Sequence, residues 1–289
     1  MRPASFGSRA HLHAKRSAKT AVIALHCSGS SGRQWDSLVS AMGDHYCVIA
    51  PDLYGDGTQR PWPGERPFRI SDEAAPIIDI IDRQNGAVHL VGHSYGGAVA
   101  LRAALARSSR IASLSLYEPI VPHVLKAMGP EGLSAWQEIS GLLSSLDTAI
   151  VEGAHQWAAE CFVDYFNGIG RWMAMNAEAQ TAFMRYIPKA AIESRAVMAE
   201  RIPLMAYTRL RMPTLLMHGD ATTQPTELMT RKLAAVLRTA AWHVLDGAGH
   251  MAPITHAQQI NACIGAHIRR ADGSIARDGK VPLPAWVAA

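Results

Sequence analysis

Long hydrophobic runs are missing from this sequence of 289 residues. No apolar stretch approaches the roughly 18 residues that a membrane-spanning helix needs, so we expect no membrane span. Cysteine is also scarce, and its four copies lie far apart with no pair at the Cys-x-x-Cys spacing of redox and zinc motifs. We therefore expect reduced thiols in a cytoplasmic protein. The four cysteines are Cys27, Cys47, Cys161 and Cys263.

Charge is limited as well: charged residues make up 18% of the chain, and the net charge is +4. Residues 1–20 hold five basic residues and no acidic one, which leaves 23 basic against 24 acidic residues in the remainder. A nearly neutral body does not offer a nucleic-acid-binding surface. His11 and His13 stand in the basic segment, and the other histidines do not cluster with cysteine at ligand spacing, so no metal site is expected. The apolar run 21–25 is short and leads into a small-residue loop, which favours a core strand over a targeting signal.

The sequence does contain one prominent motif, the segment Val91–Gly97 with the sequence Val-Gly-His-Ser-Tyr-Gly-Gly. A short β-prone run precedes it and an Ala- and Leu-rich run, residues 96–106, follows it, which predicts a strand, a tight turn and a helix. Such a turn strains its central residue and needs small residues two positions before and after, as Gly92 and Gly96 are around Ser94. We predict that Ser94 is a nucleophile raised above a sheet. The spacing of the glycines does not match a dinucleotide-binding turn.

Strands and helices alternate on both sides of this motif, which predicts an α/β fold with a mostly parallel sheet flanked by helices. Between them, residues 122–212 show helical spacing of apolar side chains, which predicts a helical cap insertion. The expected parts are a core of residues 1–121 and 213–270, a cap of residues 122–212 and a poorly ordered tail, 271–289. Residues 1–20 show only a weak pattern for one or two edge strands. The strands are expected at 20–25, 46–50, 87–91, 111–117, 213–217 and 241–245, and the core helices at 36–42, 71–83, 96–108, 226–237 and up to about 270.

Three features together resemble the α/β-hydrolase superfamily, in the order in which they occur there. They are the small-residue loop that starts at His26, the turn Gly92–Gly96, and the late Gly249-His250 after the last predicted strand. The resemblance covers about residues 20–121 and 213–268 and is closest to single-domain hydrolases with a helical cap. It implies the α/β-hydrolase fold and serine hydrolase chemistry without a cofactor, but it says little about the substrate.

A serine hydroxyl is a weak nucleophile until a base takes its proton, and His250 is our candidate for that base. It lies between small residues after a strand, and the superfamily order of serine, acid and histidine implies a late histidine. His93 lies inside the turn itself, where its ring cannot be placed over Ser94. We expect His26 to brace the loop that follows it.

The acid departs from the commonest superfamily pattern. The resemblance usually puts an aspartate a few residues into the loop after the second-last strand, where this sequence has Thr222. Asp220 is acidic but stands early in that loop. A second superfamily position is the end of the strand that follows the nucleophile's helix, and that strand ends here in Glu118. We favour Glu118, with Asp220 as the alternative and neither of them as a third possibility. Asp52 is expected to stabilise its own turn.

An oxyanion hole would consist of two backbone N–H groups, one from Tyr95 and one from the loop at Cys27 and Ser28. The superfamily usually has His-Gly in that loop, whereas this chain has His26-Cys27, so the donor stays open between Cys27 and Ser28. Aromatic residues of the cap are expected mostly to pack against each other, with a minority lining a pocket for a small apolar acyl or ester substrate. These aromatic residues are Trp136, Trp157, Phe162, Tyr165, Phe166 and Trp172.

The resulting hypothesis is a serine hydrolase that cleaves a carboxylic ester or related acyl compound through an acyl-enzyme. Hydrolysis of a carbon–carbon bond, or peroxide-dependent acyl chemistry, could use the same three residues. A haloalkane dehalogenase would need a carboxylate nucleophile at position 94 and is disfavoured. The rival from another class is a catalytically slow, ligand-binding relative, which turnover would distinguish.

Overall fold

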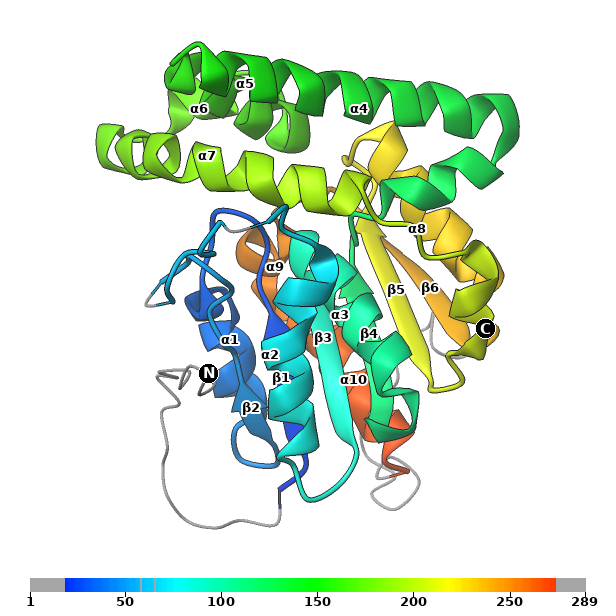
Figure 1. The fold of residues 1–289 in the computed structure, drawn as a ribbon. Coiled ribbons are helices and arrows are strands. Elements are labelled where there is room, and N and C mark those ends of the chain that lie inside the picture. The colour runs from blue at the N-terminus through cyan, green and yellow to red at the C-terminus, as the bar shows by residue number, and fades with distance from the viewer. Residues whose placement is uncertain (1–18, 58, 65, 274–289) are drawn as a thin grey trace.

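The computed structural model describes residues 19–57, 59–64 and 66–273. Its centre is a six-stranded sheet in the order β2-β1-β3-β4-β5-β6, in which every neighbouring pair is parallel (Figure 1). This confirms the predicted α/β fold. The predictions for His11, for His13, for edge strands in the first residues and for most of the tail lie outside the described residues. The strands are β1 (Ala21–Leu25), β2 (Cys47–Ile49), β3 (Val88–His93), β4 (Ile111–Tyr117), β5 (Thr214–Gly219) and β6 (Ala240–Leu245).

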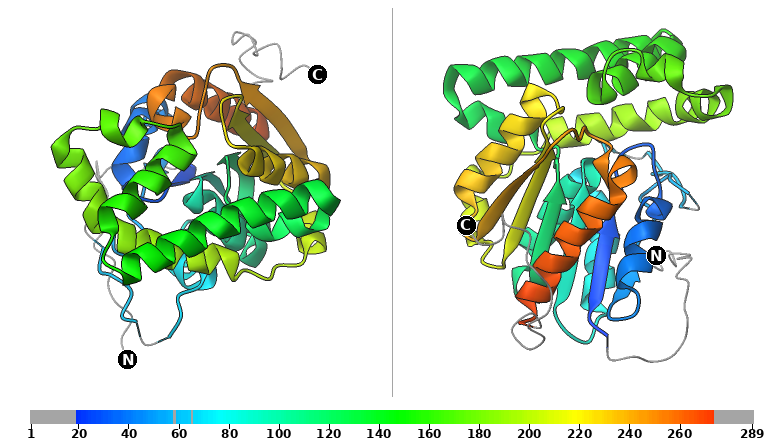
Figure 2. Two further views of the ribbon diagram at one scale, coloured as in Figure 1. Left: turned by 90° about the horizontal axis from the view of Figure 1, so that it is seen from above. Right: turned by 180° about the vertical axis from the view of Figure 1, so that it is seen from behind.

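Helices cover both faces of the sheet (Figure 2). Side chains along β1 alternate between the two layers: Ile23 and Leu25 join the core under α2 and α3, and Val22 and Ala24 join the core under α1 and α10. Strands that are buried on both faces read as continuous apolar runs, which made β1 recognisable in the sequence. These helices are α1 (Asp36–Met42), α2 (Ile70–Asp82), α3 (Tyr95–Ala106), α8 (Gln224–Val236), the short α9 (Ala252–Thr255) and α10 (Ala257–Ala271).

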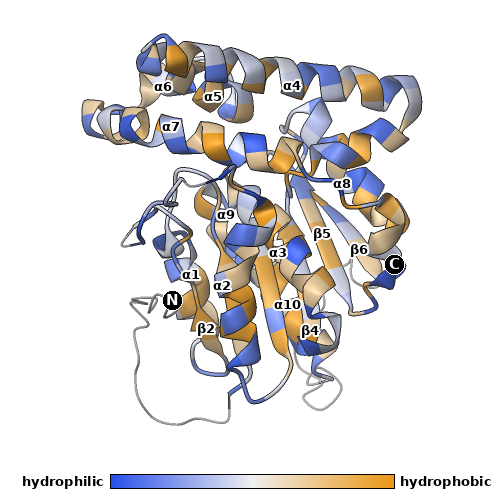
Figure 3. Cartoon of the chain, in the orientation of Figure 1, coloured by the Kyte–Doolittle hydropathy of each residue, from blue (hydrophilic) through white to orange (hydrophobic). Residues whose placement is uncertain are grey.

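Four further helices lie across the carboxyl ends of the strands, as Figure 1 shows. They form the insertion between β4 and β5 and lie within residues 122–212, and they are called the cap helices below. The division of the whole chain into core, cap and tail stays a prediction. Apolar and polar positions are interspersed along them (Figure 3), and Ile139, Leu146 and Ile187 are buried in the same cluster as the residues under α2 and α3. The helices are α4 (Gly129–Val151), α5 (His155–Asn167), α6 (Arg171–Ala174) and α7 (Ala177–Met198), between the short 3-10 helices Pro122–Ala127 and Leu204–Arg209.

Two local details differ from the expected elements. Helix α2 begins at Ile70, one residue before the expected start at 71, and its first turn is closed by Asp72, which accepts the N–H of Arg69 at 3.0 Å. The helical spacing over residues 122–212 gave no bounds for single helices; in the structure α4 ends at Val151 and the chain turns at Gly153, where φ is +78°. Glycine adopts this left-handed conformation without steric cost, so the apolar spacing alone did not indicate the turn.

Candidate active site

Ser94 stands at the turn between β3 and α3, with φ 55° and ψ −119°, a conformation that non-glycine residues rarely adopt. The chain can turn this sharply because Gly92 and Gly96 have no side chains. A Cβ atom on Gly92 would come within 2.7 Å of the Gly96 oxygen, and one on Gly96 would come within 2.4 Å of the His26 oxygen. The two small residues are therefore required by close backbone approaches, one of them to the loop after β1.

Three buried polar side chains meet at the carboxyl end of the sheet. His250 Nε2 lies 2.9 Å from Ser94 Oγ, and His250 Nδ1 lies 2.6 Å from Glu118 Oε2. Ser94 follows β3, Glu118 follows β4 and His250 lies in the loop after β6, so the ends of three parallel strands bring them together. Because a carboxylate only accepts hydrogen bonds, Nδ1 carries the proton towards Glu118, and Nε2 is free to accept the Ser94 hydroxyl.

Glu118 is held by its backbone and by hydrogen bonds from three groups, the Gly219 N–H, the Thr222 hydroxyl and the His250 ring. Its φ is 45°, and in the described part of the chain Ser94 and Glu118 are the two non-glycine residues with positive φ. The Gly219 N–H donates to Oε1 and the Thr222 hydroxyl donates to Oε2, each at 2.9 Å. Burial alone raises the pKa of Glu118, but the hydrogen bond and charge of His250, with the donors Gly219 and Thr222, outweigh it and hold the pKa below its usual range.

The structure places the two candidate acids in different surroundings. Glu118 is completely buried against His250, whereas the side chain of Asp220 is exposed. Thr222 occupies the position at which the superfamily commonly has its aspartate, and here it donates to Glu118. The loop after β5 therefore contributes hydrogen-bond donors that hold an acid from the neighbouring strand.

Hydrogen bonds of the His93 side chain, at the end of β3, link Gln34 to the loop that contains His250. Gln34 Nε2 lies 3.1 Å from His93 Nδ1, and His93 Nε2 lies 2.8 Å from the backbone oxygen of His250. Burial, together with the charge of His250, lowers the pKa of His93 well below its usual value, so the ring is neutral with its proton on Nε2. The sequence did not indicate that Gln34 would contact His93, because a glutamine in a polar loop shows no pattern that identifies its hydrogen-bond partner.

The predicted oxyanion donors differ in what their N–H groups contact. The N–H of Cys27 donates to Gln34 Oε1 at 3.1 Å, so this group is already engaged. Within the described residues, the backbone N–H groups of Ser28 and Tyr95 make no hydrogen bond to the protein. Both residues line the same cavity as Ser94. The geometry thus favours Ser28 over Cys27 as the donor from the loop after β1.

Hydrogen bonds of the His26 and Asp52 side chains hold the loop after β1. His26 Nδ1 donates to the Cys27 oxygen at 2.8 Å, and Nε2 accepts the N–H of Leu53 at 3.0 Å, which is the predicted bracing role. Burial lowers the pKa of His26 to about 4, so its ring is neutral. Asp52 was expected to stabilise its own turn, but it also accepts the N–H of Gly32 at 2.9 Å and so ties its turn to the loop after β1.

A cavity of about 370 Å³ lies over Ser94 between the sheet and the cap helices. Its polar lining includes Glu193 and Ser194 of α7, and its remaining wall is apolar. Two of the six cap aromatics noted in the sequence, Phe162 and Phe166, line it, in agreement with the expected minority. The apolar wall consists of Ile120, Ile139, Leu143, Phe162, Phe166 and Val197.

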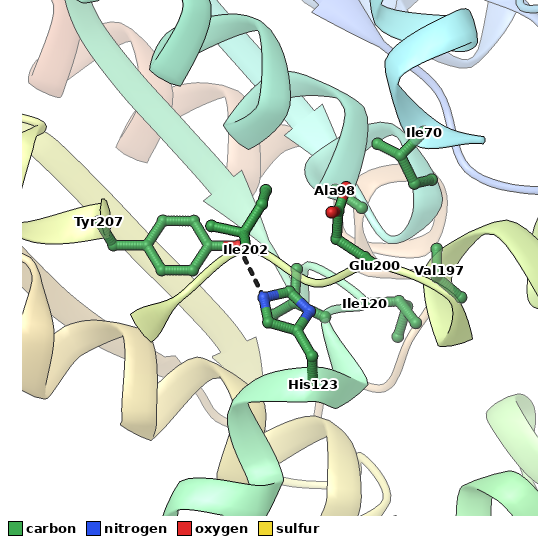
Figure 4. Close-up of a pocket in the computed structure, with 9 residues that line it drawn as sticks. Ile70, Ala98, Ile120, His123, Val197, Glu200, Ile202 and Tyr207 are labelled. Carbon is green, nitrogen blue, oxygen red and sulfur yellow. Dashed lines mark hydrogen bonds between the residues drawn. The ribbon is translucent and has the colours of Figure 1, made fainter. Parts of the chain in front are cut away.

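A smaller cavity of about 210 Å³ adjoins the first, and Ile120 and Val197 line both (Figure 4). On its far side His123 Nε2 lies 2.9 Å from the hydroxyl of Tyr207. Burial lowers the pKa of His123 to about 4, so this ring is neutral. Glu200, just after α7, adds the carboxylate of this cavity.

All four cysteines are free thiols. Across residues 19–57, 59–64 and 66–273, no three histidine, cysteine, aspartate or glutamate side chains are grouped as metal ligands. In the same part of the chain, no helix has both the length and the apolar character that crossing a membrane requires.

Comparisons with known proteins agree with this architecture. The sequence model of the alpha/beta hydrolase family matches residues 22–262. Among solved structures, a thermophilic esterase from Thermogutta terrifontis superposes with a TM-score of 0.64 at 22% identity, over 87% of this chain and 90% of the esterase. An enol-lactonase from Burkholderia xenovorans gives a TM-score of 0.63 at 18% identity, over 88% and 93% of the two chains. At these identities the likeness shows the fold.

Matches to curated proteins range from short segments of higher identity to most of the chain at lower identity. Lipase LipV of Mycobacterium tuberculosis is 36% identical over 114 residues, which are 38% of this chain and 42% of the lipase. The putative carbamate hydrolase RutD of Yersinia enterocolitica is 37% identical over 91 residues, 30% of this chain and 31% of that protein, so each match spans less than half of its relative. The bifunctional esterase/perhydrolase DCH of Acinetobacter calcoaceticus is 25% identical over 249 residues, 83% of this chain and 88% of the relative.

Proposed function

From the chain's membership of the alpha/beta hydrolase family, which makes it a hydrolase with esterase and lipase relatives, we propose that it cleaves a carboxylic ester through Ser94, His250 and Glu118. The observation that carries this proposal is the continuous hydrogen-bonded path from Ser94 Oγ through both ring nitrogens of His250 to Glu118. Two strained backbone positions at its ends support a functional role, because such strain persists where the surrounding structure maintains it.

In the proposed reaction, Ser94 Oγ attacks the ester carbonyl carbon while His250 Nε2 takes the hydroxyl proton. Collapse of the tetrahedral intermediate breaks the bond to the alkoxy oxygen, and His250 returns the proton to the leaving alcohol. Water then attacks the acyl-enzyme with His250 again as base, which releases the carboxylic acid and restores Ser94. Glu118 stays ionised throughout, orients the ring and stabilises its charged form.

Negative charge on the carbonyl oxygen would be stabilised by the N–H groups of Ser28 and Tyr95. Their positions beside Ser94 in one cavity support this assignment, and the start of α3 adds its favourable dipole. The engaged N–H of Cys27 makes it the less suitable donor. No cofactor takes part in this scheme.

The substrate we propose is a small, mainly apolar acyl or ester compound, because the cavity over Ser94 is walled largely by aliphatic and aromatic side chains. The free thiols support work in the reducing cytoplasm. Perhydrolysis is the second candidate, because a relative that matches 83% of this chain is a bifunctional esterase/perhydrolase. In that reaction hydrogen peroxide would replace water as the acceptor of the acyl group.

Labelling of the purified protein with a fluorophosphonate tests this proposal, with hydrolysis of p-nitrophenyl acetate and butyrate measured beside it. We expect labelling to vanish in Ser94→Ala and to fall sharply in Glu118→Gln. Asp220→Asn is the matched control and should keep wild-type labelling, since its side chain is exposed. An unlabelled wild type that also lacks ester turnover would count against the proposal and favour a ligand-binding relative.

A further inference from the structure

Both proposed oxyanion donors have side-chain hydroxyls that donate to buried carboxylates. Ser28 Oγ donates to Glu193 Oε2 at 2.6 Å, and the Tyr95 hydroxyl donates to Glu73 Oε2 at 3.1 Å. Glu193 is 1% exposed and Glu73 is completely buried. Each proposed backbone donor therefore belongs to a residue whose side-chain hydroxyl is held by a buried carboxylate. The two anchors differ in origin, because Glu73 comes from α2 of the core and Glu193 from α7 of the cap.

Glu193 is itself held on both oxygens. Its Oε2 also accepts the hydroxyl of Tyr186, and its Oε1 is paired with Lys189, both from α7. Lys189 in turn bonds Asp56, which lies in the loop after β2. These partners matter because an unpaired charge in the protein interior is strongly unfavourable. The cluster therefore joins two residues of the core, Ser28 and Asp56, to three of the cap.

The loop at Ser28 also packs directly on α7. The next residue, Gly29, has φ +73°, and a Cβ atom at that position would come within 2.8 Å of the Phe183 ring of α7. A hydrogen bond at Ser28 and a close approach at Gly29 thus fix two consecutive residues against the same helix. The conformation of the loop depends on a helix that is distant in sequence and belongs to the cap.

We propose that Glu193 is a positioning residue for the oxyanion hole, holding the Ser28 hydroxyl so that the Ser28 N–H points at the reacting carbonyl. The inference rests on the proposed function and deepens it. Since α7 belongs to the cap, the donor is in place only while α7 lies on the core. The cap then does more than enclose the substrate, because its seating completes the catalytic geometry.

The first test compares Ser28→Ala with Tyr186→Phe, because each variant removes one hydroxyl that donates to the same oxygen of Glu193. We expect Ser28→Ala to lower kcat about 10- to 100-fold with KM little changed, since misplacing one donor weakens transition-state binding. Inhibition by a trifluoromethyl ketone, whose adduct with Ser94 carries an oxyanion, should weaken by the same factor. Tyr186→Phe keeps the hydrogen bond between Ser28 and Glu193 and loosens Glu193 from one side only, so its losses of kcat and of inhibitor binding should be smaller than those of Ser28→Ala.

A second pair of variants checks the result from the cap side. Glu193→Gln keeps one acceptor oxygen for Ser28, whereas Glu193→Leu keeps none, so kcat should fall more in Glu193→Leu at comparable thermal stability. If Ser28→Ala matches Tyr186→Phe, with kcat and inhibitor binding close to wild type, Glu193 only fastens the cap and the inference is wrong. That result differs from failure of the proposed function, in which the wild type itself shows neither labelling nor turnover.

Discussion

The carboxyl end of the sheet and the cap enclose the same cavity, but different forces hold their residues in place. In the core, His250, Glu118 and His93 are fixed by hydrogen bonds between loops at the ends of parallel strands. In the cap, the cavity wall is mostly apolar packing, and the polar exception is Glu193 with its neighbours on α7. Hydrogen bonds fix direction and apolar packing fixes volume, so the core should determine the reaction and the cap the size of the substrate.

The sharpest contrast between the two regions should come from adding one methyl group to each. Gly96→Ala places a Cβ atom 2.4 Å from a backbone oxygen of the core, so we expect a loss of about 3 kcal/mol of unfolding free energy and of nearly all activity. Gly141→Ala, on the exposed side of α4, meets no atom within 4 Å and should gain ~0.5–1 kcal/mol. Urea unfolding of both variants measures the difference; equal effects would contradict it.

Removal of a side-chain amide should also act differently in the two regions. Gln34→Leu leaves His93 Nδ1 and the Cys27 N–H without partners, so we expect a cost of about 2–3 kcal/mol and a kcat at least 10-fold lower. Gln180→Leu removes a single bond to the Trp172 oxygen in the cap and should cost about 1 kcal/mol with kcat unchanged. Thermal unfolding and steady-state kinetics of the pair test this. A fully active Gln34→Leu would refute a positioning part for Gln34.

Acid should weaken the core through His26. Its pKa is lowered from 6.5 to about 4 by burial, so its contribution to stability is present above pH 6.5 and is lost as the pH falls towards 4. Between pH 7 and pH 5 this amounts to about 2 kcal/mol. His26→Gln, which cannot take up a proton, should be less stable than wild type at pH 7 but lose less on acidification. A parallel loss in both proteins would assign the acid sensitivity to other groups.

The smallest effect is expected in the wall of the cavity. Leu143→Ala enlarges the pocket, so kcat/KM for p-nitrophenyl hexanoate should rise about 10-fold relative to that for the acetate. Leu142 directly precedes Leu143 in α4 and does not line the cavity, so Leu142→Ala controls for loss of packing in that helix. The ratio of the two kcat/KM values is the measurement. An unchanged ratio in Leu143→Ala would mean that the acyl chain does not lie against α4.

The parts of the fold that were predictable are those with a local signal. The strand expected at 111–117 and the helix expected at 36–42 coincide with β4 and α1. Their apolar runs are bounded by turn residues, and the first run is buried on both sides. The helix expected from residue 71 begins one residue earlier, at Ile70, where Asp72 accepts the N–H of Arg69, a contact that the sequence pattern did not specify.

In the site, a local pattern indicated Ser94, and the resemblance to the superfamily pointed to His250 and Glu118. Neither indicated the residues that hold these three side chains. Thr222 could be noticed only as a departure from a resemblance, and its bond to Glu118 depends on how β4 and β5 are paired. The contact of Glu193 with Ser28 joins positions 165 residues apart. Such pairs follow from the seating of one layer on another, which periodicity and motif spacing do not specify.

The location of Glu118 at the end of β4 has a consequence for how the molecule folds. Ser94 and Glu118 belong to one contiguous β3-α3-β4 unit, and the Ser94 N–H donates to the Tyr117 oxygen across the two strands at 3.0 Å. Closing so short a segment costs little chain entropy, whereas His250 lies 132 residues beyond Glu118. We expect Ser94 and Glu118 to come together early on the folding pathway, and His250 to arrive last. A partly folded chain would then have the turn at Ser94 already formed but would not yet have His250 beside it, so its serine hydroxyl would be unreactive.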